Sequence, residues 1–168
     1  MDYLAAISRF ASAAETYCSW LESEPSTSAQ EHYLATKLVA ELYASALLLP
    51  ATEPVSGDTS SVTQEQRQMI LQRLKLFPFR YYWEVFHPVK LEPEEPVCGD
   101  ITDDFLDIYA DVKEGLLAYV VNEQSAVWHW RTTFGFHWGA HAASALRALH
   151  SYNPDDGIAW GGGFAPSD

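Results

Sequence analysis

Apolar residues recur at helical spacing along most of the chain. Within residues 3–21 they lie alternately four and three positions apart: Tyr3, Ile7, Phe10, Ala14, Tyr17 and Leu21. This spacing predicts an amphipathic helix that packs one face against other helices. The stretch EPSTS breaks the pattern. Ser28, with Glu31 three residues later, forms a capping box that predicts a second helix, and this helix stops at Pro50.

The middle of the chain alternates between predicted loops and shorter helices. Residues 50–61 are rich in Pro, Gly and hydroxyl side chains, which predicts an exposed loop. Thr63 and Gln66 form a second capping box and predict a third helix. The proline-bounded segment 77–88 carries aromatic residues at helical spacing, which predicts a short aromatic helix: Phe79, Tyr82, Trp83 and Phe86. Residues 89–100 are predicted to form a second loop.

Two longer helices are predicted in the C-terminal half. Asp100 is expected to cap a helix over 101–121, and a fifth helix is expected over 122–152. Residues 153–168 combine Pro, Gly and Asp, which predicts an irregular tail. No segment alternates at period two for long enough to predict a sheet. We therefore predict an all-α protein, with one domain over 1–152 that forms a compact helical bundle of about five main helices plus the short aromatic helix.

Two glycines lie four residues apart in the fifth predicted helix. Gly135 and Gly139 fall on the side opposite the apolar stripe. A glycine inside a helix costs about 1 kcal/mol relative to alanine, so a pair suggests that another backbone packs very close to them. The apolar stripe and the glycine pair thus predict that other helices pack on two opposite sides of the fifth helix, which would make it the central one.

The fourth predicted helix carries many carboxylates, at Asp103, Asp104, Asp107, Asp111 and Glu114. Its apolar residues form the opposite arc, so the favoured interpretation is a solvated outer face. The alternative is a metal site for a hard cation, because Asp104, Asp107 and Asp111 share one face and such cations take oxygen ligands. That alternative requires another helix to cover this face. The spacing does not match an EF-hand loop.

His137 and His141 lie four residues apart, within the apolar stripe of the fifth predicted helix. The favoured interpretation is a pair of core histidines, each satisfied by a hydrogen bond. A second is a small-molecule pocket that these histidines line together with Tyr82, Trp130 and Trp138. A third is a metal ion held between helices with the acids of 103–111. The chain has neither Glu-x-x-His nor His-Glu-x-x-His, so no local motif decides between them.

The charge and the cysteines limit the function classes. Ten Lys and Arg against 23 Asp and Glu give a net charge of −13, which disfavours binding to nucleic acid or anionic membranes. The favoured interpretation of this charge is solubility, and the alternative is the attraction of a basic partner or a cationic ligand. Cys18 and Cys98 form no motif, and Cys18 is expected to be inert because it lies on the buried stripe of the first helix. The N-terminus does not have the pattern of a signal peptide, and no apolar run approaches the length needed to span a membrane. We expect a cytoplasmic protein.

Three stretches together resemble a known family: YYWEVFHP (81–88), DDFLDIYADVKEGL (103–116) and AVWHWRTTFGFHWGAHAASALRALH (126–150). In this order they are similar to the bacterial family known as domain of unknown function 5063. The family pattern has an acid at the position of His87, so no role for that carboxylate carries over. The resemblance implies a small all-helical bacterial protein and implies no reaction.

Two functions of different class follow from the sequence. The favoured one is a non-enzymatic accessory or interaction protein, a monomer or homodimer, with no cofactor. The alternative is a bundle that binds a small molecule or a divalent metal through His137 and His141 with acids of the 103–111 helix, and hydrolysis is one reaction that such a site could perform.

Overall fold

Most of the predicted helices are present in the structure, a computed structural model that describes residues 3–55, 61–153 and 158–159. These residues form six helices: α1 (Tyr3–Glu22), α2 (Ser28–Ala46), α3 (Gln64–Leu74), α4 (Ile101–Tyr119), α5 (Glu123–Phe136) and α6 (Trp138–Ser151). They also form two short antiparallel strand pairs, β1 (Tyr81–Glu84) with β2 (Val97–Asp100) and β3 (Tyr152–Asn153) with β4 (Ile158–Ala159). The protein is thus a helical bundle, as predicted, with small sheets that the sequence did not indicate.

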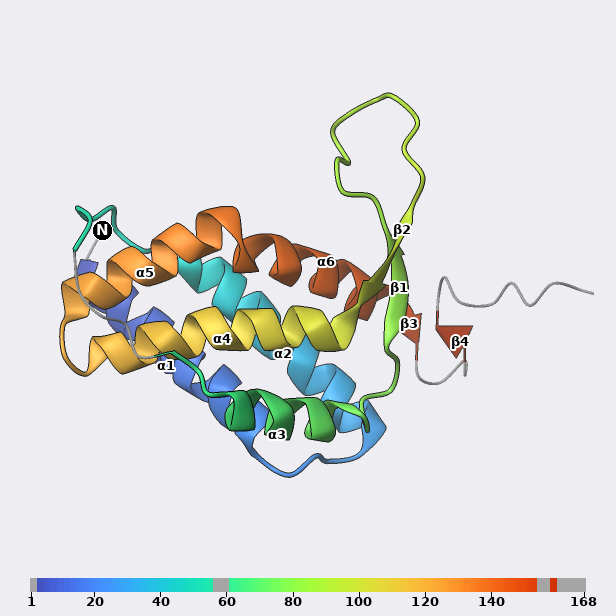
Figure 1. Cartoon of the computed structure of the whole chain (residues 1–168), viewed down its shortest axis with the longest axis horizontal. Coiled ribbons are helices and arrows are strands. Elements are labelled where there is room, and N and C mark those ends of the chain that lie inside the picture. The colour runs from blue at the N-terminus through green and yellow to red at the C-terminus, as the bar shows by residue number, and fades with distance from the viewer. Residues whose placement is uncertain (1–2, 56–60, 154–157, 160–168) are drawn as a thin grey trace, which may run out of the picture.

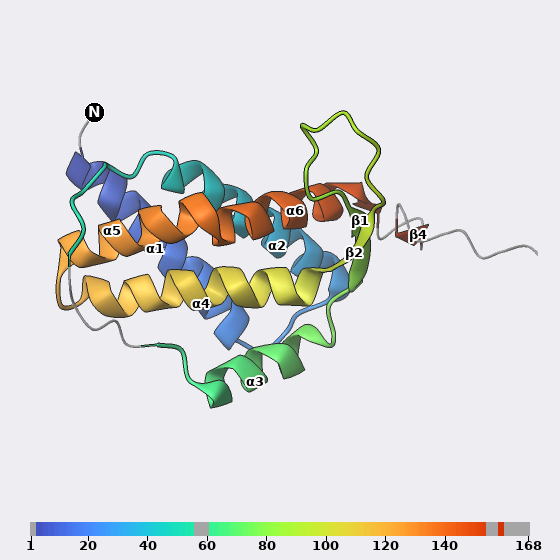
Figure 2. The ribbon, with the colours of Figure 1, turned by 45° about the horizontal axis from the view of Figure 1, so that its top comes forward.

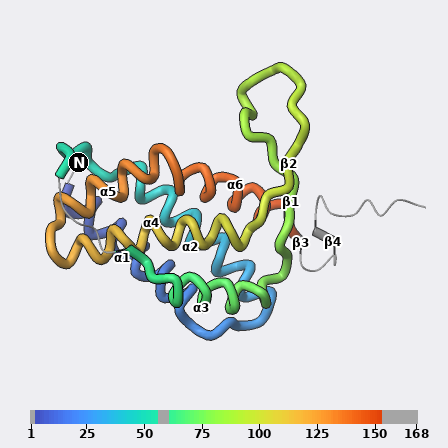
Figure 3. The backbone as a smooth tube through the Cα atoms, in the orientation of Figure 1, coloured from blue at the N-terminus to red at the C-terminus, as the bar shows by residue number. Residues whose placement is uncertain are grey.

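The helices form two layers with α4 at the centre. α4 runs away from the β1–β2 hairpin, the chain turns, and α5 and α6 return alongside it (Figure 3). α1 and α2 form the second layer, and α3 lies along the edge against α1 and α4 (Figure 1). α4 therefore packs against four other helices, which corrects the prediction that the 122–152 segment is central.

Aromatic side chains fill the space between the layers. Trp130 and Trp138 are fully buried against Phe10, with ring centroids 4.8 and 6.1 Å from it. The Trp130 indole N–H donates to the Val112 carbonyl of α4 at 3.0 Å. A Cβ at Gly115 would lie 1.9 Å from that indole nitrogen, so this glycine creates the space for the ring.

Glu31 does not cap α2 but lies in a buried polar network. The N-cap of α2 is Thr27 with Gln30, one position before the predicted capping box. The Glu31 carboxylate accepts hydrogen bonds from the Trp20 indole at 3.0 Å and from Arg73 of α3 at 2.6 Å. The network joins α1, α2 and α3. The caps predicted for α3 and α4, at Thr63 and Asp100, are confirmed.

The prediction of a short helix over 77–88 is wrong, because these residues enter a hairpin. Aromatic residues have a high β propensity, and exposure alternates along β1 with period two. Tyr82 pairs with Gly99 of β2, and a Cβ at Gly99 would lie 2.5 Å from the Tyr82 ring. The hairpin and its long connection extend from one end of the bundle (Figure 2). Each strand has only four residues, which is too few for an alternation of apolar and polar residues to predict a strand from the sequence.

The fifth predicted helix is broken at His137. This residue has non-helical dihedral angles (φ −137°, ψ −89°) and separates α5 from α6. Within the described part of the chain, the predicted close approach of a separate backbone to Gly135 and Gly139 is not found. Gly135 has no atom near the position of a Cβ, whereas a Cβ at Gly139 would lie 2.3 Å from the carbonyl oxygen of Phe134. Gly139 is thus needed by the break itself, which brings the end of α5 close to the start of α6.

Cys18 is buried in α1, and burial raises the pKa of its thiol, in line with the expected inert role. Among the described residues, no helix has the length and apolarity to cross a membrane. Most of the predicted irregular tail, 153–168, lies outside the described residues.

Candidate functional site

The acids of α4 and the histidines of α6 face each other across a helix–helix interface. Asp104 is buried, and Asp107 and Asp111 are half-buried, because the α5–α6 segment covers this side of α4. The prediction of a wholly solvated acidic face is therefore wrong for these three residues, although Asp103 remains exposed. The condition set for a metal site on α4, that another helix covers the face, is met.

His141 is held by Asp104. Its Nδ1–H donates to Asp104 Oδ1 at 2.8 Å, and the Tyr82 hydroxyl of β1 donates to Asp104 Oδ2 at 2.6 Å. The hydrogen bond to Asp104 raises the pKa of His141 above its ordinary value, against the effect of burial. Burial raises the pKa of the Asp104 carboxyl group, and the hydrogen bonds from His141 and Tyr82 oppose that rise. Tyr82 therefore links the hairpin to the histidine through one carboxylate.

His137 is held in the same way by a second carboxylate. Its Nδ1–H donates to Asp111 Oδ2 at 2.8 Å. The break between α5 and α6 places His137 at the first position before α6, so its ring lies beside that of His141, with centroids 5.1 Å apart. Each imidazole thus uses Nδ1 as a donor to its own aspartate, which leaves Nε2 with the lone pair in the neutral ring.

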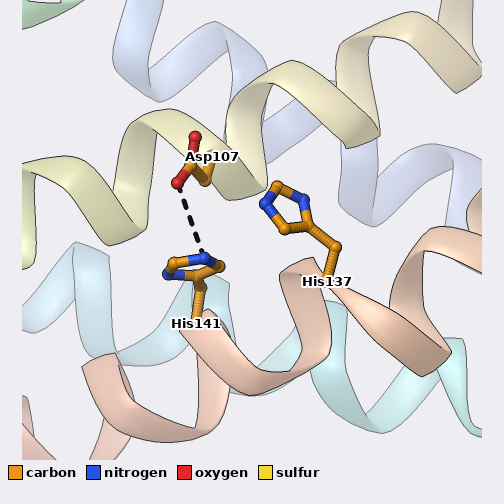
Figure 4. Close-up of side chains that lie close together, drawn as sticks. All are labelled: Asp107, His137 and His141. Atoms are coloured by element: carbon orange, nitrogen blue, oxygen red, sulfur yellow. Dashed lines mark ion pairs between the residues drawn. The ribbon is translucent and has the colours of Figure 1, made fainter.

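Asp107 completes a group of three potential metal ligands. One ligand atom from each of Asp107, His137 and His141 lies within 4.8 Å of the other two. Figure 4 shows the three side chains turned toward a common space, with Asp107 on α4 and the two rings opposite it. His141 Nε2 lies 3.5 Å from Asp107 Oδ2. Zinc binds nitrogen at about 2.0–2.1 Å, so two ligands of one tetrahedral ion lie roughly 3.4 Å apart, close to this separation.

The donor set suits a transition metal better than a hard cation. Imidazole nitrogens bind zinc, iron, copper and nickel, whereas calcium and magnesium prefer oxygen. In the neutral ring the lone pair of His141 Nε2 faces the negative oxygen of Asp107, and either a proton on Nε2 or a metal cation between the two atoms removes that repulsion. The three aspartates predicted as metal ligands therefore have two different roles. Asp104 and Asp111 each accept a hydrogen bond from a histidine Nδ1, whereas Asp107 accepts none and faces the common space.

A second acidic group lies further along α4. Ligand atoms of Asp111, Glu114 and His129 also lie within 4.8 Å of one another. Each of these residues has a protein partner: Asp111 holds His137, Glu114 accepts from the Val62 N–H at 3.3 Å, and His129 Nε2 donates to the Asp111 carbonyl at 3.0 Å. These contacts account for the group without an ion.

The remaining predicted site residues divide between core and site. Trp130 and Trp138 are fully buried, and their indole N–H groups donate to backbone carbonyls, so they support the helices rather than line a pocket. Tyr82 does reach the site, from a strand and not from the predicted helix. The roles of Asp104 and Asp111 as partners of the histidines could not be predicted, because they depend on the packing of α4 against α6.

A cleft of about 470 Å³ adjoins His141. It lies between the β1–β2 hairpin, the start of α4 and the middle of α6, and both Asp104 and His141 line it. A larger groove of about 860 Å³ lies elsewhere, between the end of α1 and α3. We consider the smaller cleft to be the functional one, because it includes a histidine–aspartate pair and the groove includes no histidine or cysteine among its lining residues.

The comparisons with known proteins are consistent with this fold. The structure is similar to the crystal structure of protein BF1032 from Bacteroides fragilis, with a TM-score of 0.73, 22% sequence identity, and coverage of 87% of this chain and 90% of that chain. At this identity the similarity establishes the fold alone. A search of curated proteins gave no match. The sequence matches the family described as domain of unknown function (DUF5063) over residues 1–154, nearly its whole length, and the chain therefore belongs to that family.

Proposed function

We propose that this protein binds one divalent transition-metal ion through Asp107, His137 and His141. The observation that carries the proposal is the pair of histidines, each of which donates Nδ1–H to its own aspartate. Metal-bound histidines in proteins typically donate their second ring nitrogen to a carboxylate, which fixes the tautomer and the ring orientation. Here two such pairs present Nε2 toward one carboxylate.

The polar composition of this partly buried interface supports a binding role over a purely structural one. A helix interface is most simply stabilised by apolar side chains, and buried charged pairs often contribute no more than an apolar substitute. This interface instead holds three aspartates and two histidines, and the side chains of His137 and His141 keep 41% and 29% of their surface accessible. An ion from solvent could therefore reach the nitrogens.

Three protein ligands are the number found in catalytic zinc sites, which keep a fourth position for water or substrate. Two histidines and one carboxylate are also the ligands of many non-haem iron enzymes. The donor set thus favours zinc or iron(II), and the partial exposure favours a site that exchanges its fourth ligand.

Metal titration of the full chain tests the proposal. After removal of metal with a chelator, calorimetry with Zn²⁺ and anaerobic titration with Fe²⁺ should each give a stoichiometry near one. His137→Ala and Asp107→Ala should lower the affinity by at least about 100-fold, which corresponds to about 2.7 kcal/mol. His150→Ala is the matched control, because His150 is exposed on α6, the helix that carries His141, and lies outside the group, and it should bind as the wild type does.

Equal affinity in His137→Ala and His150→Ala would overturn the proposal. Thermal unfolding with and without Zn²⁺ gives a second readout. The ion should raise the Tm of the wild type, since binding to the folded state alone stabilises it, and should not raise that of Asp107→Ala.

A role as an interaction partner is a second candidate, supported by the hairpin. Five large apolar side chains are exposed on the hairpin and its connection: Tyr81, Trp83, Phe86, Val89 and Leu91. Exposed apolar groups of this density are typical of protein contacts. Affinity capture with the wild type and with the double variant Phe86→Ser/Leu91→Ser tests this candidate. The expected result is a basic protein that binds to the wild type and does not bind to the variant.

A further inference from the structure

We propose that the cleft beside the metal site binds a small organic cation with an apolar body, such as an arylalkylamine. The cleft lies between the hairpin, the start of α4 and α6. The proposal names the ligand class of the same centre, and it rests on the proposed metal function for the claim that the ligand lies next to an ion.

The charge of the cleft selects a cation. Its lining includes four carboxylates and no lysine or arginine: Glu84, Asp100, Asp103 and Asp104. Arg80 neutralises Asp100 in an ion pair at 2.9 Å, and His141 compensates Asp104. Glu84, which accepts from the Tyr82 hydroxyl at 3.0 Å, and Asp103, which has His141 and Arg67 nearby, form no ion pair among the described residues. An anionic ligand would meet this surplus negative charge.

The start of α4 does not cancel that surplus. A helix N-terminus contributes roughly half a positive charge, which is less than one of these carboxylates. Desolvation contributes most to the raised pKa of Asp103, the carboxylates of Asp107 and Asp100 add to the rise, and His141 and Arg67 oppose it. A cation near Asp103 would offset the repulsion between these carboxylates.

The walls of the cleft select an apolar body. The hairpin contributes Val85, Phe86, Pro88 and Val97, and α6 contributes Ala140 and Ala143. A volume of about 470 Å³ suits a molecule the size of an aromatic amine or a single peptide side chain. A ligand of this kind would bury its apolar group under the hairpin and place its charge near the carboxylates.

His141 connects the cleft to the proposed ion. The residue lines the cleft, holds Asp104 through Nδ1 and faces Asp107 through Nε2. Only the His141 side chain would therefore separate a ligand in the cleft from the proposed metal position.

Titration of the full chain with phenethylamine, followed by NMR, tests the assignment. The expected result is saturable binding with shifts at Val97, Ala140 and Ala143, and binding of the uncharged 2-phenylethanol at least fivefold weaker. Asp103→Asn should weaken phenethylamine binding about five- to tenfold. Glu53→Gln, which removes a carboxylate at an exposed position outside the cleft, should leave it unchanged.

Measurements in chelator and in excess Zn²⁺ separate this proposal from the metal proposal. Charge-dependent amine binding without zinc binding would end the metal proposal and the claim of adjacency, and would keep the cleft assignment. Zinc binding with no preference of phenethylamine over 2-phenylethanol, or with no effect of Asp103→Asn, would overturn the cleft assignment.

A paramagnetic ion tests the adjacency directly. With Co²⁺ in place of Zn²⁺, the protons of bound phenethylamine should relax faster, and His137→Ala, which removes a ligand of the ion, should abolish the effect. Relaxation unchanged by Co²⁺ in the amine-bound wild type would show that the two sites are separate.

Discussion

Asp111 on α4 accepts a hydrogen bond from His137, at the junction of α5 and α6, with Asp111 Oδ2 2.8 Å from His137 Nδ1. The side chain of Asp111 is mostly buried and that of His137 is 41% exposed. The aspartate therefore fixes the ring from the protein side, while the other ring nitrogen faces the potential metal position. Asp111 is a positioning residue for the proposed ion and is not one of its ligands.

This relationship predicts that Asp111→Ala weakens metal binding without removing a ligand. Loss of such a partner typically costs 10–100-fold in metal affinity, because the histidine loses its orientation and some basicity. Calorimetric titration with Zn²⁺ measures the change. Asp103→Ala is the control, since it removes the same charge from the same helix at an exposed position, and it should change the affinity by less than about twofold. An equal loss in both variants would mean that net charge, and not ring orientation, sets the affinity.

The second prediction concerns the pH dependence of stability in the metal-free protein. The hydrogen bond to Asp104 raises the pKa of folded His141 above 6.5. The protonated ring therefore stabilises the folded state fully below the unfolded pKa, and this contribution is lost as the pH rises through the folded pKa. Urea unfolding in chelator should show a larger stability difference between wild type and His141→Gln near pH ~6 than near pH ~9. A difference that grows with pH would contradict the assigned ion pair.

Local signals predicted the helices well and failed where the structure depends on distant contacts. The apolar spacing of 3–21 and the caps at Thr63 and Asp100 are properties of short segments, and they were confirmed. The β1–β2 hairpin depends on Tyr82 packing over Gly99, seventeen residues later in the chain, a contact with no local pattern. Its aromatic spacing was compatible with a helix, so the sequence alone favoured the wrong element.

The candidate site was partly visible in the sequence. The spacing of His137 and His141 correctly marked both residues as neighbours. The apolar arc of the 101–121 segment predicts a single buried face, and this places the acids of α4 in solvent. In the structure α4 is packed from several sides, so Asp104 is buried as well. A charged residue inside a central helix cannot be distinguished from a surface one until its neighbours are known.

The third prediction concerns the buried pair of Arg73 and Glu31. Their side chains are 7% and 3% exposed, and Glu31 also accepts from the Trp20 indole. Arg73→Met should lower the free energy of unfolding by about 3–5 kcal/mol, because it leaves a buried carboxylate without its cation. Lys37→Met is the control, since Lys37 and Glu41 are half-exposed and 3.9 Å apart, and it should cost less than about 1 kcal/mol. Chemical denaturation measures both variants, and similar losses would show that Glu31 is stabilised by its other donors.

The last prediction compares the two glycines on either side of His137. A Cβ at Gly139 would lie 2.3 Å from the backbone oxygen of Phe134, whereas a Cβ at Gly135 would meet nothing within 4 Å. Gly139→Ala should therefore destabilise the protein by about 1–3 kcal/mol, because a backbone atom cannot move aside as a flexible side chain can. Gly135→Ala should be neutral or stabilising by up to about 1 kcal/mol, since alanine favours the helix.

The same two variants show whether the helix break at His137 also controls metal binding. The break sets the position of His137, so Gly139→Ala should also weaken Zn²⁺ binding in the fraction that remains folded, and Gly135→Ala should not. Thermal unfolding gives the stability change and calorimetry gives the affinity. If Gly139→Ala lowers stability but leaves the affinity unchanged, the position of His137 is set by Asp111 alone. If Gly135→Ala is the more harmful variant, a close partner of α5 exists in solution, as the sequence first suggested.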